Sequence, residues 1–190
     1  MNKDIGADTA LEELSKLKKK YDDTWKKIET YQRYEEILEV EHVKIPQAET
    51  FDARYTKRLT LWTNRQTFAG QRNTWYTEDL RKQDAEAIVA IVKKYHQENL
   101  QMKIKARDEV DEVLDAFTDE VKEVHAHKEL IQALGRPAMQ PRHWKKVFAL
   151  LDGNFTGGLD LPIQFNQLLT DGAANFVEEI EEISGQAVGE

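Results

Sequence analysis

The 190-residue sequence contains no cysteine, only four prolines and only nine glycines. Without cysteine, the chain has no disulfide bond, no thiolate metal site and no thiol catalysis. No apolar run approaches the roughly 20 residues that span a bilayer, and Met1 to Gly6 lack the apolar core of a signal peptide. We therefore expect a cytoplasmic chain with no membrane partner.

Motifs for nucleotide chemistry and nucleophilic catalysis are also missing from the sequence. Neither the G-x-x-x-x-G-K-[ST] loop nor the G-x-G-x-x-G fingerprint occurs. Ser15 and Ser184 lie in charged segments with no histidine nearby, so neither is a candidate nucleophile. We therefore expect no catalytic residue, no cofactor and no metal in this chain.

Charged residues, by contrast, are abundant. They make up 33% of the chain, against about 25% in an average protein, whereas apolar residues reach only 40%. Such a composition favours solvent-exposed helices with narrow apolar stripes. The 35 acidic and 27 basic residues give a net charge of -8, which repels phosphate backbones and argues against nucleic acid as a partner.

The first predicted helix runs from about Thr9 to about Val40, and Thr9 with Glu12 has the spacing of a capping box. Six residues recur three and four apart along it: Leu14, Leu17, Tyr21, Thr24, Ile28 and Tyr31. Leu11 and Trp25 widen this stripe. Because its aromatic members are bulky for a two-stranded coiled coil, the pattern favours a helix within a bundle.

Pro46 ends this pattern, because a proline disfavours helical geometry in the residue before it. A second helix is predicted from about Gln47 to about Asn73, with Phe51, Tyr55, Leu59, Trp62 and Ala69 facing inward. After a break near Trp75 to Thr77, we expect Thr77 to cap a third helix with an apolar face of Leu80, Ala85, Ile88, Val92 and Tyr95. A fourth helix is predicted with Val110, Val113, Leu114, Phe117 and Val121.

The last third of the chain holds three of the prolines and most of the glycines. It predicts short helices over Arg142–Leu151, Pro162–Thr170 and Ala173–Ser184, with a glycine-rich turn at Asp152 to Gly158. No segment alternates with period two as a strand does. The predicted fold is therefore all-α, an elongated bundle of several amphipathic helices with short connecting helices at the C-terminal end. We expect residues 1–45 and 46–190 to be parts of one continuous helical region.

Two features resemble metal sites without completing one. The segment from Asp152 to Asp160 begins like an EF-hand calcium loop, with oxygen-bearing side chains at positions one, three, five and nine and Gly157 at position six. The bidentate glutamate of position twelve is replaced by Ile163, so a capped turn is favoured and a calcium-sensing module is the alternative. His125 and His127, two residues apart, point to different helix faces and are interpreted as solvated.

Two segments carry a resemblance to a known family. Tyr21, Trp25, Lys27, Ile28 and Tyr31 resemble the F-x-x-x-W-x-K-L-x-x-Y pattern at the start of the linker of axonemal dynein heavy chains. The segment from Pro137 to Val147, with Ala138-Met139 before Arg142-His143-Trp144, is similar to the n-x-a-m-x-x-R-H-W signature of the same family. Ile180 to Glu190 looks like the segment that follows, so the resemblance covers about Leu11 to Glu190.

This resemblance implies a role that composition alone does not give. Dynein heavy chains are microtubule motors with an ATPase ring, a tail, and a linker that swings during the ATP cycle. The chain resembles the tail-proximal start of that linker, which implies a non-catalytic mechanical and assembly element in the cytoskeleton of a cilium or flagellum. The implied partners are the rest of the heavy chain with its ring, and dynein intermediate or light chains or neighbouring heavy chains.

A spectrin-like scaffold is a further alternative for the function of this chain. Of the signature residues, Trp144 is expected in the core and Arg142 beside a carboxylate or helix carbonyls.

Overall fold

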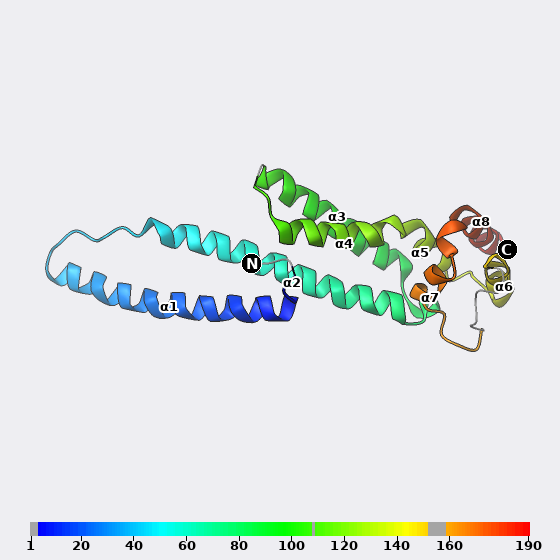
Figure 1. Cartoon of the computed structure of the whole chain (residues 1–190), viewed down its shortest axis with the longest axis horizontal. Helices are drawn as coiled ribbons and strands as arrows, with labels where there is room; N and C mark the ends of the chain where they lie inside the picture. The colour runs from blue at the N-terminus through cyan, green and yellow to red at the C-terminus, as the bar shows by residue number, and fades with distance from the viewer. Residues whose placement is uncertain (1–3, 108, 152–158) are drawn as a thin grey trace. The chain divides into compact units, whose positions relative to one another are not determined.

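The computed structural model describes residues 4–107, 109–151 and 159–190. Every regular element among these residues is a helix, so the predicted all-α class is confirmed. Figure 1 shows the elements, which are α1 (Ala7–Ile37), α2 (Pro46–Thr77), η1 (Leu80–Lys82), α3 (Ala85–Ala106), α4 (Glu112–Ala126), α5 (Lys128–Leu134), α6 (Pro141–Leu150), α7 (Phe165–Thr170), η2 (Ala173–Asn175) and α8 (Val177–Gly189). The chain divides into two compact units, one up to Phe68 and one from Ala69 onward, and α2 contributes to both.

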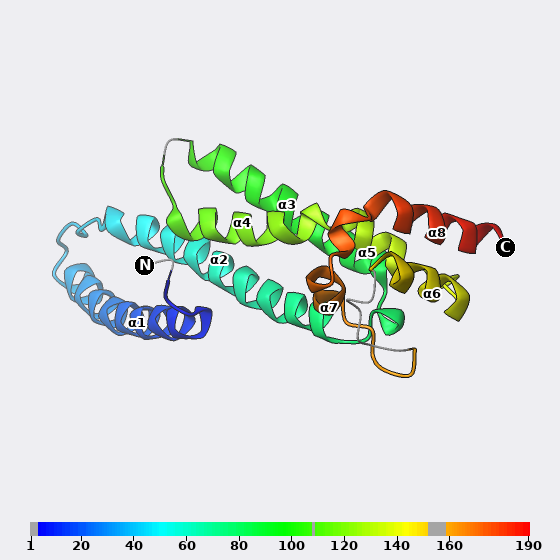
Figure 2. The same ribbon diagram turned by 45° about the vertical axis from the view of Figure 1, so that its right-hand side comes forward.

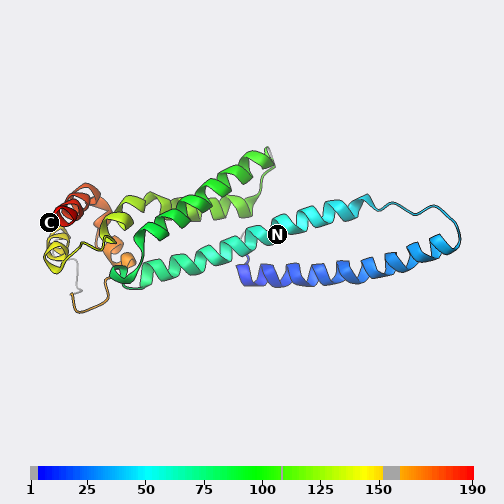
Figure 3. The same cartoon turned by 180° about the vertical axis from the view of Figure 1, so that it is seen from behind.

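Unit 1 is a hairpin in which α1 runs antiparallel to the first part of α2 (Figures 1 and 3). Pro46 is the first residue of α2, a position where its missing N–H costs nothing. The two helices meet through aromatic rings, since Tyr21 of α1 stacks on Phe51 of α2 with ring centroids 4.0 Å apart. A hydrogen bond from Gln66 to Asp8 joins the two helices again near the start of α1.

The apolar stripe of unit 1 is only partly buried. On α1, Leu14 is 4% exposed, but Leu17 is 47% exposed and Tyr31 is 64% exposed. On α2 the predicted inward positions of Leu59 and Ala69 were wrong, because both are exposed. Two successive steps of four residues rotate a helix position by about 80°, which carries Leu59 away from the line of Phe51 and Tyr55. Trp62 is fully buried, as predicted, and Leu61 and Phe68 of the same helix are buried as well.

Unit 2 is built on an antiparallel pair, α3 and α4 (Figure 2). The Tyr95 ring meets the Phe117 ring edge to face at 5.8 Å, beside buried residues of both helices: Ile88, Val89, Val92, Val113, Leu114 and Val121. Lys103 and Asp115 form an ion pair of 2.5 Å across the two helices. The paired apolar faces account for the antiparallel packing.

The start of α3 differs from the sequence prediction. Thr77 does not cap it, because Thr77 is the last residue of α2 and its hydroxyl donates to the Asn73 carbonyl at 2.8 Å. Asp84 caps α3 by accepting from the Ala87 N–H at 3.0 Å, and Leu80 lies in the short helix η1. Asp111 caps α4 in the same way through Leu114 N–H, which leaves Val110 outside the helix and 84% exposed.

The remaining helices of unit 2 complete its core. Helix α5, which was not predicted as a separate helix, packs on α8. The buried apolar residues include Leu130, Ile131 and Leu134 of α5 and Ile180 and Ile183 of α8. Ser184 is buried and donates to the Ala133 carbonyl at 2.7 Å, which fixes the two helices against each other. Helix α8 continues beyond the predicted end at Ser184, to Gly189.

Gly135, just after α5, lies where no larger residue fits. A Cβ there would overlap the Cβ of Ala85 and would lie 3.1 Å from the Ile131 carbonyl oxygen. We predict that Gly135→Ala lowers the free energy of unfolding by about 1–3 kcal/mol, the usual cost of overpacking. Urea denaturation of the variant measures this loss.

The matched control for this change is Gly185→Ala. Gly185 lies inside α8, and a Cβ there would meet nothing within 4 Å. Alanine should therefore stabilise the helix by about 0.5–1 kcal/mol. Combining Gly135→Ala with Ala85→Gly should restore part of the lost stability. Equal effects at Gly135 and Gly185 would contradict the close contact with Ala85.

Candidate functional site

The connection between α2 and α3 is held by a charged clamp, which we define as Asp79 and Arg81. The Arg81 guanidinium donates to both carboxylate oxygens of Asp79, at 2.9 and 2.7 Å. It also donates to the carbonyls of Leu159 and Leu161, at 2.8 and 3.0 Å. A single side chain therefore ties η1 to a segment about 80 residues later in the chain.

The backbone reinforces this clamp. The Leu80 N–H donates to the Ile163 carbonyl at 2.8 Å, and the Ile163 N–H donates to an Asp79 carboxylate oxygen at 3.4 Å. Asp79 is 8% exposed, and the Arg81 guanidinium holds the pKa of this carboxyl below its usual range against the opposing effect of burial. A buried carboxylate with this many donors stays charged and fixes the groups that surround it.

A second joint connects α6 and α8 through the predicted signature residues. Arg142 and His143, at the start of α6, both reach the Glu190 carboxylate, Arg142 through its guanidinium and His143 through Nε2 at 3.3 Å. One turn further along, Lys146 donates to Gln186 of α8 at 3.1 Å. These pairs run along the two helices and hold α6 beside α8.

His143 also determines where α6 begins. Its Nδ1 accepts from the Gln140 backbone N–H at 3.1 Å, the reciprocal contact of a capping box. The ring is almost fully buried, and burial lowers the pKa of His143, with Arg142 and Lys146 acting in the same direction. The other ring nitrogen, Nε2, faces both the Glu190 carboxylate at 3.3 Å and the Arg142 Nε at 3.5 Å.

Trp144 is the buried member of the signature. It is 2% exposed and its ring lies 5.9 Å from the Phe148 ring, one turn later in α6. Its indole N–H is buried and has no hydrogen-bond partner among the residues that the structure describes. The ring therefore contributes to unit 2 through its apolar area and not through a polar contact.

We predict that Trp144→Ala lowers the free energy of unfolding by about 3–5 kcal/mol, as expected for a truncated core tryptophan. Trp144→Phe should cost much less, because it keeps an aromatic ring and removes an N–H that makes no hydrogen bond within the described part of the chain. Thermal and urea denaturation of both variants measure these effects. A Trp144→Ala variant within about 0.5 kcal/mol of wild type would indicate a surface role for this residue instead.

His125 of α4 is not simply solvated, contrary to the sequence interpretation. It is half-buried and stacks on His96 of α3, with ring centroids 4.4 Å apart and ring planes 13° from parallel. Burial lowers the pKa of His125, and electrostatic interactions with His96, Lys128 and Lys93 act in the same direction, opposed by Glu129. His127 is also half-buried and meets the Phe165 ring edge to face at 6.1 Å.

The stacked histidines predict a pH-dependent stability. Because the pKa of His125 is lower in the folded than in the unfolded state, the unfolded state binds more protons. The stability from the neutral ring is fully present above about pH 6.5, the unfolded value, and is lost as the pH falls through the lowered folded pKa. We predict that His125→Phe, which keeps a stacked ring without a titrating nitrogen, loses less stability between about pH 7.5 and pH 5.5 than wild type.

Melting curves at the two pH values measure the difference between the proteins. Groups that do not interact with His125 contribute equally to both proteins, so the change in slope is attributed to the stacked pair. The same slope in wild type and variant would contradict this prediction.

The aromatic signature residues of α1 lie in unit 1. Tyr21 and Trp25 stack with ring centroids 6.1 Å apart, and both are half-buried. Tyr31 is exposed and does not join this stack. The structure therefore brings together Tyr21 with Trp25, and Arg142 with His143, whereas Tyr31 stands apart. The clamp residues and Glu190 were not predicted, although an aspartate two residues before an arginine at a helix junction indicates a local pair.

The glycine-rich turn and most of the candidate calcium loop, Asp152 to Gly158, lie outside the described residues. Ile163, at the loop's twelfth position, is fully buried beside the clamp. Within the described ranges no group of three or more histidine, aspartate or glutamate side chains could hold a metal ion. None of the described helices combines the length and apolarity that crossing a membrane requires.

A family model described as dynein heavy chain, N-terminal region 2, matches residues 48–190, which include both joints and most of α2. No curated protein matches the chain. The resemblance to a dynein heavy chain N-terminal fragment is therefore confirmed.

Proposed function

Since the chain belongs to the dynein heavy chain family, N-terminal region 2, we propose that it is a mechanical element at the tail-proximal start of the linker. It transmits force between the tail and the ATPase ring and takes no part in nucleotide chemistry. The observation that carries this proposal is the clamp of Asp79 and Arg81, which ties η1 to a distant segment of the chain.

The physical argument concerns the joints between helices. A helix resists bending along its axis, so a chain of helices yields first at its connections. In unit 2 the connection after α2 is cross-tied to residues 159–163, and the start of α6 is tied to the end of α8. Contacts of this kind between residues far apart in sequence oppose hinge motion at the positions where it would begin.

The finer parts of the proposal rest on the signature residues. The Tyr21-to-Tyr31 and Arg142-His143-Trp144 segments resemble those of axonemal heavy chains, which supports a place in the cytoskeleton of a cilium or flagellum. The proposed partners are the remainder of the heavy chain, including its ATPase ring, and the intermediate or light chains or neighbouring heavy chains of the motor. Tyr31, exposed at the surface of α1, is available to such a partner.

The test uses Arg81→Met in the complete heavy chain. Removing the guanidinium deprives a buried carboxylate and two carbonyls of their donor, which should cost about 1.5–3 kcal/mol of stability in unit 2. We predict that microtubule gliding by the variant motor slows while ATP turnover by its ring continues at the wild-type rate. Gliding assays and steady-state ATPase measurements on the same preparation give both quantities.

The matched control is Lys94→Met, which removes an exposed pair with Glu98 of 3.9 Å on α3 of the same unit. Exposed pairs contribute about 0–1 kcal/mol, so this variant should glide like wild type. A lowered melting temperature of the isolated Arg81→Met chain shows that the clamp is lost. If the motor carrying this variant still glides at the wild-type speed, the result contradicts the mechanical role. A parallel fall in ATP turnover would contradict the separation from nucleotide chemistry.

A further inference from the structure

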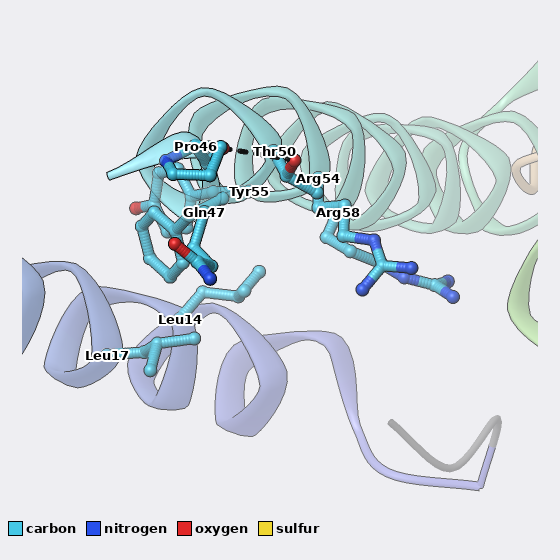
Figure 4. Close-up of a pocket in the computed structure, with 9 residues that line it drawn as sticks. Leu14, Leu17, Pro46, Gln47, Thr50, Arg54, Tyr55 and Arg58 are labelled. Atoms are coloured by element: carbon cyan, nitrogen blue, oxygen red, sulfur yellow. Dashed lines mark hydrogen bonds between the residues drawn. The ribbon is translucent and has the colours of Figure 1, made fainter. Parts of the chain in front are cut away.

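Unit 1 carries an open groove of about 540 Å³ between α1 and α2, which we call the hairpin groove. Figure 4 shows leucines of α1 facing side chains of the first three turns of α2 across it. Its lining residues are Leu14, Leu17, Pro46, Gln47, Thr50, Phe51, Arg54, Tyr55 and Arg58. All of them belong to unit 1, so the groove is complete within the hairpin.

The floor of the groove is apolar, and stacking between aromatic rings holds it in position. The Phe51 ring stacks on Tyr21 of α1 at 4.0 Å and on Tyr55 at 5.9 Å, which fixes it between the two helices. Leu17 contributes an edge that is 47% exposed, although Leu14 one turn earlier is buried. An exposed leucine beside stacked aromatic rings provides an apolar surface that a second apolar surface can cover.

The rim of the groove has a charge opposite to that of the chain. Arg54 and Arg58, one turn apart on α2, are its charged lining residues, and no carboxylate lines it in the described part of unit 1. The chain as a whole carries a net charge of -8. The Arg54 side chain is exposed, so the positive rim is accessible from solvent. A ligand attracted to this rim carries negative charge next to an apolar face.

From this combination we infer that the hairpin groove binds an acidic amphipathic α-helix of a partner polypeptide. The groove runs along α2 from Pro46 to Arg58, which corresponds to about 18 Å or three turns of a partner helix. A helix satisfies its own backbone hydrogen bonds, which suits an apolar floor that offers few partners. Its leucine-like residues at positions i, i+3, i+4 and i+7 cover Phe51 and Leu17, and its carboxylates face Arg54.

This inference does not depend on the mechanical role, because it concerns contacts within unit 1 and not the joints of unit 2. A bound third helix completes a three-helix bundle in which the half-buried stripe of α1 is covered. A second copy of the chain is the competing occupant, and the experiment separates it from a partner helix by the oligomeric state.

The probe is a synthetic peptide of about 20 residues, labelled with a fluorophore, with leucines at helical spacing and glutamates four apart along one flank. A control peptide of the same length carries lysine at each glutamate position. Fluorescence anisotropy with the whole chain should show saturable binding of the acidic peptide and none of the basic one. Arg54→Glu should raise the dissociation constant of the acidic peptide by about threefold to thirtyfold, because an attraction between opposite charges becomes a repulsion between like charges. Leu17→Asp should also weaken binding of the acidic peptide, because it removes an apolar contact and places a carboxylate beside the peptide's glutamates.

The matched control is Lys57→Glu, which reverses an exposed charge on α2 outside the groove and should bind like wild type. Circular dichroism confirms that each variant is folded. Three results would overturn the inference: no saturable binding of the acidic peptide, equal loss in Lys57→Glu and Arg54→Glu, or equal binding of the basic peptide. Concentration-dependent dimerisation in sedimentation, abolished by Leu17→Asp, would assign the groove to a second copy instead.

Discussion

The buried carboxylate of Asp79 is the constraint on which the architecture of unit 2 depends. A charged group with so little exposure is costly unless donors surround it. Those donors come from Arg81 and from the Ile163 backbone. Because the donors must come together around one carboxylate, the position of Asp79 fixes the path of two segments that are distant in sequence. The Arg81 guanidinium extends this constraint to the Leu159 and Leu161 carbonyls.

The core of unit 2 continues directly from this clamp. Ile163 is fully buried beside it, and two residues later the Phe165 ring meets Tyr76 of α2 at 5.2 Å and His127 at 6.1 Å. The ring of Phe165 thereby contacts the end of α2 and the corner between α4 and α5. Gln164 adds a hydrogen bond of 2.5 Å to the Thr77 carbonyl. The clamp thus determines where α7 begins and which elements meet around it.

The sequence predicted the helices that have long periodic faces, and it did not predict the contacts between them. Helix α2 begins at Pro46 because proline suits a first helical position, and the break near Thr77 was also predicted. The three-residue helix η1 is too short to produce a periodicity. The acceptors of Arg81 are backbone carbonyls, which every residue carries, so no sequence pattern indicates them. Arg142 and Glu190 form a pair although they lie 48 residues apart in the sequence. A local sequence pattern does not predict a contact at that separation.

The two units meet the same physical requirement in different ways. Unit 2 buries its apolar residues among short helices that cross-tie one another. Unit 1 has two long helices and one shared face, so it leaves large apolar residues exposed toward the end of α1 and in the connection to α2: Tyr31, Tyr34, Ile37, Leu38, Val40 and Val43. Folded proteins seldom expose so many neighbouring apolar residues unless another surface covers them. A hairpin with an incomplete core suits an element that assembles with partners, and a cross-tied unit suits an element that resists deformation. The place that we propose for this segment, between a tail and a motor ring, requires both properties.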